Sequence, residues 1–163
     1  AVELAFSADG TRVLFAGEDI SGQIRTLEIG QGASKVSAMP RVRAALLAMQ
    51  RDAGRVGGVV LEGRDIGTVV FPDAEAKFYL TASVDVRAGR RFAELSAGGA
   101  QADLEQVKRE VLERDRRDST RPIAPLKQAA DAVVLDSSDL PVDQVVQRIV
   151  RHVRAVQAAL SER

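Results

Sequence analysis

The sequence predicts an α/β fold in which a parallel sheet is flanked by helices. Three short apolar runs, each followed by polar residues, have the length and composition of buried parallel strands; they cover residues 59–61, 78–80 and 132–135. Segments with helical spacing of apolar residues follow the second and third runs. Because strands that alternate with helices form parallel sheets covered by those helices, we expect this architecture here.

A β-hairpin is predicted at the start of the chain. Apolar and polar residues alternate over 2–6 and again over 13–15, which is the period of a strand with one buried face. Between these runs, Asp9-Gly10 tolerates the positive φ angles of a tight turn. We therefore expect two antiparallel strands joined near Asp9 and Gly10.

A helix is predicted beyond the glycine-punctuated stretch 17–32. Pro40 suits the first turn of this helix, and Gly54 is placed to end it. The apolar residues between them recur at helical spacing; they are Val42, Ala45, Leu46 and Met49. Residues 1–54 are accordingly expected to form a small β-rich insert with helices, and residues 55–163 the α/β core.

Three further helices are predicted in the core. Ser83 can cap a helix over 84–95, and a second helix follows over 102–117. Gly98-Gly99 marks a break between them, and the last helix starts near Pro141. The apolar side of that last helix is expected to contain Val142, Val145, Val146, Ile149, Val153 and Val156.

Composition restricts the class of protein. Of the 163 residues, 45% are hydrophobic and 28% charged, which is ordinary for a globular protein and too apolar for disorder. The formal net charge of zero provides no field that would attract nucleic acid. No apolar run approaches the roughly 20 residues of a membrane helix. We expect a cytoplasmic protein that binds neither nucleic acid nor membrane.

The cysteine and histidine counts restrict metal chemistry. The sequence has no cysteine and one histidine, His152, so it cannot supply a thiolate site or a histidine cluster for zinc. A metal ion, if used, is expected to be bound by oxygen and to arrive with the substrate.

Two charged segments are candidates for a ligand site. In residues 62–68, glycines let the backbone approach a ligand, while Arg64 and Asp65 supply a phosphate fork and a hydrogen-bond acceptor. In residues 113–122, basic and acidic side chains crowd the end of a predicted helix. By pattern alone the first segment fits a loop ion pair equally well, and the second fits a solvated helix face better than a site.

A third candidate is the set Arg87, Arg90 and Arg91. These arginines share one face of the predicted helix over 84–95, at positions i, i+3 and i+4. We expect no acidic residue to face them, which favours a contact with phosphate. A surface stripe of extended arginine stems is the alternative interpretation.

These segments, in this order, resemble the bacterial cytidylate kinase family, a branch of the nucleoside monophosphate kinases. The most specific stretches are 63–73 (GRDIGTVVFPD), 113–126 (ERDRRDSTRPIAPL) and 129–132 (AADA). Residues 17–26, with the hairpin before them, are similar to the β-rich insert of that family's monophosphate-binding domain. Residues 33–36 and 40–43 match its base-contacting helical stretch.

The resemblance implies roles for the residues that would bind the monophosphate. Asp65, with Ser34 on one side and Arg43 on the other, would read the amino donor and the acceptors of cytosine. Arg64 and Arg121 would reach the phosphate. The ribose would be held by Arg114 and Asp118.

The resemblance also implies a reaction. The γ-phosphoryl group of ATP would be transferred in line to CMP or dCMP, giving CDP or dCDP, with Mg²⁺ carried by ATP. Arg87, Arg90 and Arg91 would belong to a mobile lid, at about 84–101, that closes over the ATP phosphates. The enzyme is expected to be a monomer, or to pair with a missing N-terminal segment.

One motif of the family is absent from this sequence. Members open with a strand and a phosphate-binding loop of the form GxxxxGK[ST], but none of the four lysines, Lys35, Lys77, Lys108 and Lys127, follows a glycine. We therefore expect residues 1–163 alone to show no useful kinase turnover. The alternative function is a nucleotide-binding or interaction module without catalysis.

Overall fold

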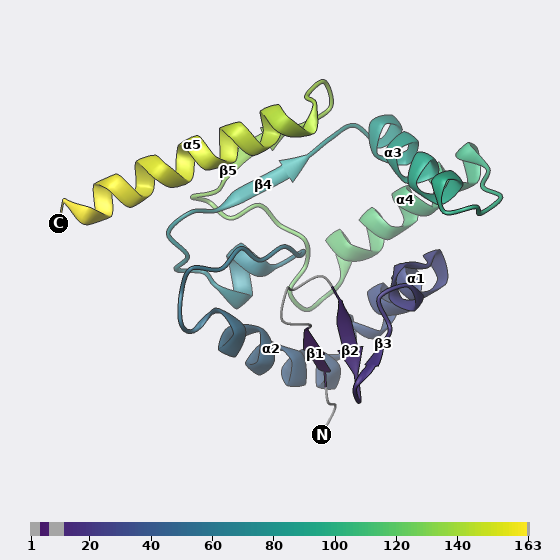
Figure 1. Cartoon of the computed structure of the whole chain (residues 1–163), viewed down its shortest axis with the longest axis horizontal. Coiled ribbons are helices and arrows are strands. Elements are labelled where there is room, and N and C mark those ends of the chain that lie inside the picture. The colour runs from purple at the N-terminus through teal and green to yellow at the C-terminus, as the bar shows by residue number, and fades with distance from the viewer. Residues whose placement is uncertain (1–3, 7–11, 163) are drawn as a thin grey trace. The chain divides into compact units, whose positions relative to one another are not determined.

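The computed structural model describes residues 4–6 and 12–162 of the chain (Figure 1). It divides into two compact units, Ala1–Ala45 and Leu46–Arg163. The division falls inside a helix that begins at Pro40, whereas the sequence predicted a boundary at residue 54, where that helix ends. The second unit is rich in helices and contains a small parallel sheet.

The first unit contains the hairpin that the sequence predicted. Strand β1 (Leu4–Phe6) pairs antiparallel with β2 (Val13–Phe15), and Leu4 lies opposite Phe15. The short strand β3 (Glu18–Asp19) adds to the other edge of β2. The predicted turn at Asp9 and Gly10 lies outside the described residues.

Two helices follow the hairpin. A 3-10 turn η1 (Gln23–Arg25) leads into α1 (Leu27–Val36). The family resemblance predicted only the end of α1, residues 33–36, and no element was predicted for the glycine-punctuated residues before it. The hydroxyl of Thr26 accepts a hydrogen bond from the backbone N–H of Ile29 and so caps α1. This cap offsets the helix-weakening glycines at 30 and 32. Helix α2 (Pro40–Gly54) has the predicted bounds.

The sheet of the second unit consists of two parallel strands. Strand β4 (Phe78–Thr81) pairs with β5 (Val133–Asp136), with Tyr79 opposite Val134, which confirms two of the three predicted strands and their parallel direction. The prediction that these strands are buried is wrong in part. Leu135 is buried, but Leu80 is 56% exposed.

The third predicted strand, residues 59–61, is wrong. These residues form no strand in the structure, and their apolar side chains are exposed; Val60 is 99% exposed. A strand needs a neighbour to satisfy its backbone N–H and C=O groups, and no strand of the described residues pairs with this run. An apolar run alone therefore did not suffice to form a strand here.

Helices α3 (Val84–Ala97) and α4 (Leu104–Thr120) lie side by side in the second unit (Figure 1). As predicted, Ser83 caps α3, because its hydroxyl accepts from the N–H of Val86. Asp103 caps α4 in the same way, which explains why that helix begins two residues later than the sequence predicted. The small buried core includes one residue from each helix, Ala88 and Val107.

A short π-helical turn, η2 (Ile66–Val70), follows the charged loop at 62–65. The guanidinium of Arg51 on α2 donates to the carbonyls of Val69 and Val70, at 3.0 and 3.2 Å. Gly54 lies so close to the ring of Phe71 that a Cβ there would overlap it. These contacts hold the end of η2, and the residue that follows it, against Arg51 and Gly54.

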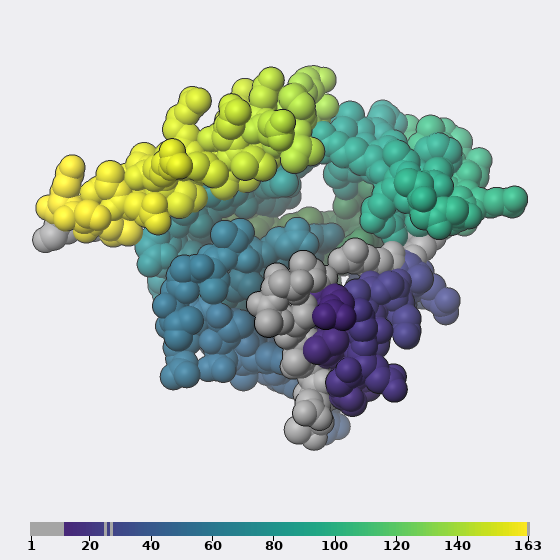
Figure 2. Space-filling view, in the orientation of Figure 1, coloured from purple at the N-terminus to yellow at the C-terminus, as the bar shows by residue number. Residues whose placement is uncertain are grey.

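The last helix, α5 (Val142–Ser161), lies along one edge of the second unit (Figure 2). His152 is half-buried, and its ring meets the edge of Phe78 in β4 at a centroid distance of 5.2 Å. On the predicted apolar side, Val142 and Val146 are 76% and 50% exposed, and the other four residues are half-buried. No helix of the described residues is long and apolar enough to span a membrane.

An ion pair next to the sheet leads to a prediction about acid stability. The ammonium of Lys77, 7% exposed, lies 2.6 Å from a carboxylate oxygen of Asp131, and this hydrogen bond lowers the pKa of Asp131 below its ordinary value of 3.8. As the pH falls, the unfolded chain takes up this proton first. The pair therefore stabilises the fold above that value, and its contribution is lost as the pH falls through the lower pKa of the folded state.

We expect Asp131→Asn to flatten the dependence of the melting temperature on pH between about 2 and 5. Melting curves of both proteins across that range test this, with Asp73→Asn at an exposed position as control. Parallel curves for the native chain and Asp131→Asn would show that the pair does not contribute to acid stability.

Candidate functional site

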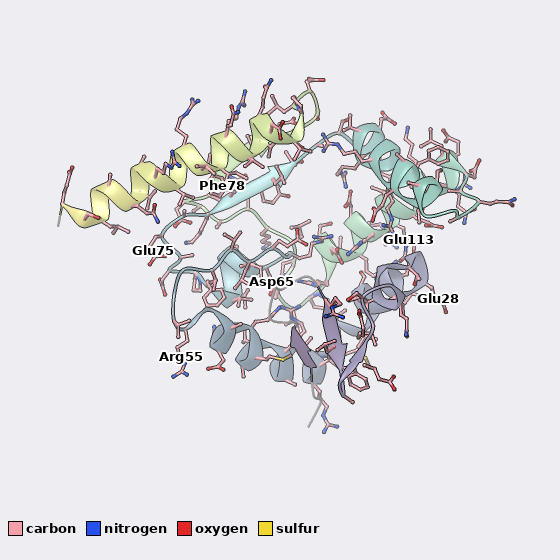
Figure 3. The ribbon with its side chains drawn as sticks, in the orientation of Figure 1. Glu28, Arg55, Asp65, Glu75, Phe78 and Glu113 are labelled. Atoms are coloured by element: carbon pink, nitrogen blue, oxygen red, sulfur yellow. The ribbon has the colours of Figure 1, made fainter. Side chains whose placement is uncertain are left out.

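Two ion pairs join the loop after residue 61 to the end of α4. Arg64 Nε lies 2.9 Å from Asp118 Oδ2, and Asp65 Oδ1 lies 3.1 Å from Arg121 Nη2. The structure thus brings together four residues that the sequence placed in two separate clusters. Figure 3 marks Asp65 beside the turn η2.

The Asp65–Arg121 pair is buried. The two side chains are 10% and 5% exposed, and Arg121 Nε also donates to the carbonyl of Ala124 at 2.6 Å. Ala124 has a φ of 48°, which is unusual for a residue other than glycine and directs this carbonyl at the guanidinium. The backbone carbonyl of Asp65 accepts from the amides of η2. Both charged groups are therefore held in fixed positions.

A second cluster consists of Asp118 between two arginines. Its side chain is 5% exposed, with Arg64 at 2.9 Å and Arg114 Nε at 3.8 Å. The Nε of Arg114 is buried and makes no hydrogen bond within the described part of the chain. Burial lowers the pKa of Arg114, and the neighbouring cations Arg64 and Arg91 lower it further, whereas Asp118 opposes this shift.

This second cluster can attract an anion. Two guanidinium groups share one carboxylate, so a further negative charge would relieve the repulsion that lowers the pKa of Arg114. A phosphate group has the charge and the geometry to bind guanidinium groups bidentately. The arrangement is therefore suited to binding a phosphate.

The three arginines of α3 have protein partners, two of them acidic. Arg87 Nη1 contacts Asp115 Oδ2 at 2.7 Å, and Arg91 pairs with Glu94. Arg90 donates to the hydroxyl of Ser137. The expectation that no acidic residue faces these arginines is wrong, because α4 brings Asp115 against α3.

Two of the predicted site residues lie in the first unit. Ser34 on α1 is 6% exposed, and Arg43 on α2 donates to the carbonyl of Ser37 at 3.3 Å. Asp65 and the residues around it belong to the second unit.

Sequence reasoning missed two residues that contact the candidate arginines, Asp115 and Ser137. Asp115 lay within the charge run, and Ser137 directly follows β5, at the carboxyl edge of the sheet where ligands bind in α/β folds. Their positions in the sequence were available, but their partners depend on how α3 packs. No group of three or more acidic or histidine side chains in the described ranges could hold a metal ion.

Comparison with known proteins identifies the family. The cytidylate kinase family model matches residues 1–155. The cytidylate kinase of Citrifermentans bemidjiense is 56% identical over 148 residues, which are 90% of this chain and 64% of that protein. That of Methylococcus capsulatus is 55% identical over 147 residues, 90% of this chain and 66% of the relative.

A further relative is the cytidylate kinase of Pseudomonas aeruginosa, which is 49% identical over 148 residues, 91% of this chain and 65% of that protein. The chain thus spans about two thirds of the length of the curated relatives that it matches. These matches confirm the resemblance seen in the charged segments. The chain belongs to the cytidylate kinase family.

Proposed function

We propose that the protein transfers the γ-phosphoryl group of ATP to CMP or dCMP. The observation that carries this proposal is the cluster of Arg64, Arg114 and Asp118, whose excess positive charge suits the phosphate of a nucleotide monophosphate. The names of the relatives support the same reaction. Phosphoryl transfer depends on positioning and on stabilising charge, and fixed guanidinium groups supply both.

In this proposal each of the two ion-paired clusters contributes one arginine to the phosphate of CMP, and their other members bind the ribose and the base. Arg64 and Arg121 contact the phosphate, while Arg114 and Asp118 hold the ribose. Asp65 accepts from the amino group of cytosine, and Ser34 and Arg43 have the base-reading roles that the family resemblance implies. Because Arg121 also binds Asp65, the phosphate and the base would be read by one connected pair of side chains.

We further propose how the segments divide this work. Residues 1–54 form the monophosphate-binding insert, residues 55–163 the core, and residues 84–101 a lid whose arginines face ATP. Residues 1–163 contain no loop of the GxxxxGK[ST] form, since no lysine in the sequence follows a glycine. We assign Mg²⁺ to ATP, which would carry the ion into the site.

Base recognition by Asp65 leads to a test of the proposal. CMP is expected to bind about 10- to 100-fold more tightly than UMP, because uracil would place a carbonyl oxygen against the carboxylate, at a cost of roughly 1–3 kcal/mol. Asp65→Asn is expected to narrow this ratio, since an amide can donate as well as accept.

Titration calorimetry with CMP and UMP on both proteins measures the ratio, and a coupled assay for ADP release in the full-length protein measures the reaction. Equal affinities of CMP and UMP for the native protein would exclude Asp65 from base recognition. Binding of CMP without any ADP release would instead contradict the proposed transfer and favour a binding module.

A further inference from the structure

The guanidinium of Arg87 is held on two of its sides. Its Nε donates to the carbonyl of Ala82 at 3.0 Å, and its Nη1 donates to Asp115 Oδ2 at 2.7 Å. These two contacts fix both the plane and the direction of the group. In the part of the chain that the structure describes, its Nη2 has no hydrogen-bond partner, so the N–H groups of that nitrogen remain available.

Arg90 differs from Arg87 in this respect. Both terminal nitrogens of Arg90 donate to Ser137, at 3.0 Å to the hydroxyl and 2.5 Å to the carbonyl. The Ser137 hydroxyl in turn donates to the carbonyl of Thr81 at the end of β4. Arg90 therefore connects α3 to the ends of the two strands. Arg87 differs from Arg90 because its orientation is fixed while its Nη2 has no hydrogen-bond partner among the described residues.

The guanidinium of Arg87 lies near the carboxyl edge of the sheet, where a ligand is expected. Ala82 directly follows β4, at the carboxyl edge of the sheet, which is the edge where parallel α/β folds bind ligands. Asp115 precedes Asp118 by three residues on α4, so both carboxylates project from neighbouring positions of one helix. Helix α4 thus contacts Arg87 through Asp115, and Arg64 through Asp118.

We propose that Asp115 is a positioning residue that orients the guanidinium of Arg87 toward a nucleotide phosphate. The proposal rests on the proposed kinase function. The short charge-assisted contact keeps Arg87 in one orientation before a nucleotide binds, so that binding does not have to order a free side chain. The guanidinium of Arg87 is then already ordered when a nucleotide binds.

The kinetic test uses Asp115→Asn in the full-length protein. Removing the charge is expected to lower kcat about 10- to 100-fold, because misplacing a phosphate-binding group by about 1 Å has effects of this size. The KM for CMP is expected to change less than about twofold, since Asp115 does not contact that site. Glu113→Gln is the matched control: it removes a carboxylate from the same helix, 63% exposed and paired with Arg117, and should leave kcat unchanged.

A double substitution separates positioning from other roles. The kcat of the double variant Arg87→Ala/Asp115→Asn is expected to lie within about twofold of the kcat of Arg87→Ala alone. The guanidinium that Asp115 positions is already absent from both variants. Equal losses in both backgrounds would overturn the proposal, as would a native kcat in Asp115→Asn.

A spectroscopic test does not depend on kinase activity. The Nε–H resonance of Arg87 in ¹⁵N NMR spectra is expected to lose intensity or shift in Asp115→Asn, as the guanidinium gains rotation, and to stay unchanged in Glu113→Gln. An unchanged resonance in Asp115→Asn would overturn the positioning role even in an active enzyme. Failure of the proposed function would appear separately, as absence of ADP release from the native full-length protein.

Discussion

Asp65→Ala is expected to lower the free energy of unfolding by about 3–5 kcal/mol, because it takes the carboxylate away from a buried guanidinium. Arg121 is 5% exposed at its side chain, and the other contact that the structure gives it is the carbonyl of Ala124. Attraction from Asp65 therefore offsets much of the cost of removing this cation from water.

Urea denaturation of the native chain and of the variant measures this loss. Asp52→Ala is the matched control, because it removes an aspartate from an ion pair with Arg55 whose side chains are 73% and 78% exposed. An exposed pair of this kind contributes about 0–1 kcal/mol. Similar losses in Asp65→Ala and Asp52→Ala would show that the Asp65–Arg121 pair contributes no more than a surface ion pair.

Arg64→Ala is expected to weaken CMP binding about 30-fold or more, corresponding to roughly 2 kcal/mol or more. The guanidinium is proposed to donate charge-assisted hydrogen bonds to the phosphate, and it holds Asp118 at 2.9 Å. Its loss removes a cation from the phosphate, while Arg114 Nε still lies 3.8 Å from the Asp118 carboxylate.

Cytidine, which has no phosphate, separates these effects. Its affinity for Arg64→Ala should fall less than about threefold below that for the native protein, and Arg109→Ala, at an exposed position of α4, should bind both ligands normally. Calorimetric titrations of both ligands provide the comparison. An equal loss for cytidine and CMP would mean that Arg64 acts on the sugar or on the fold and not on the phosphate.

The elements that could be predicted from sequence are those with local signals at both ends. Helix α3 has the Ser83 cap at its start and Gly98-Gly99 at its end, and Gly99 adopts the positive φ of 79° that favours glycine. Helix α2 has Pro40 and Gly54 at its ends. These signals depend on a few neighbouring residues, so they can be recognised without knowledge of the tertiary contacts.

Secondary structure was predicted wrongly or incompletely in two segments, residues 59–61 and helix α1. Residues 59–61 have the composition of a strand, but pairing partners come from elsewhere in a chain and cannot be inferred from the run itself. The first part of helix α1 was not predicted, because the glycines at 30 and 32 weaken a helical pattern, while the cap at Thr26 was the signal that favoured a helix.

The candidate site shows the same limit. The family motifs identified which residues to examine, including Arg64, Asp65, Asp118 and Arg121. They could not indicate that these residues form two ion pairs across 54 and 56 positions of sequence. Nor did they reveal Asp115 facing Arg87, because that contact depends on how α3 packs against α4.

The Asp65–Arg121 pair has a consequence for protein engineering. A change of the proposed substrate from CMP to another pyrimidine nucleotide would begin at Asp65, the proposed base-reading residue, yet that carboxylate also pairs with a proposed phosphate-binding side chain. Substitutions at the two positions are therefore expected to be epistatic, with effects that do not add. Libraries that randomise Asp65 and Arg121 together, and Ala124 with them, would explore combinations that single-site scanning discards as unfolded.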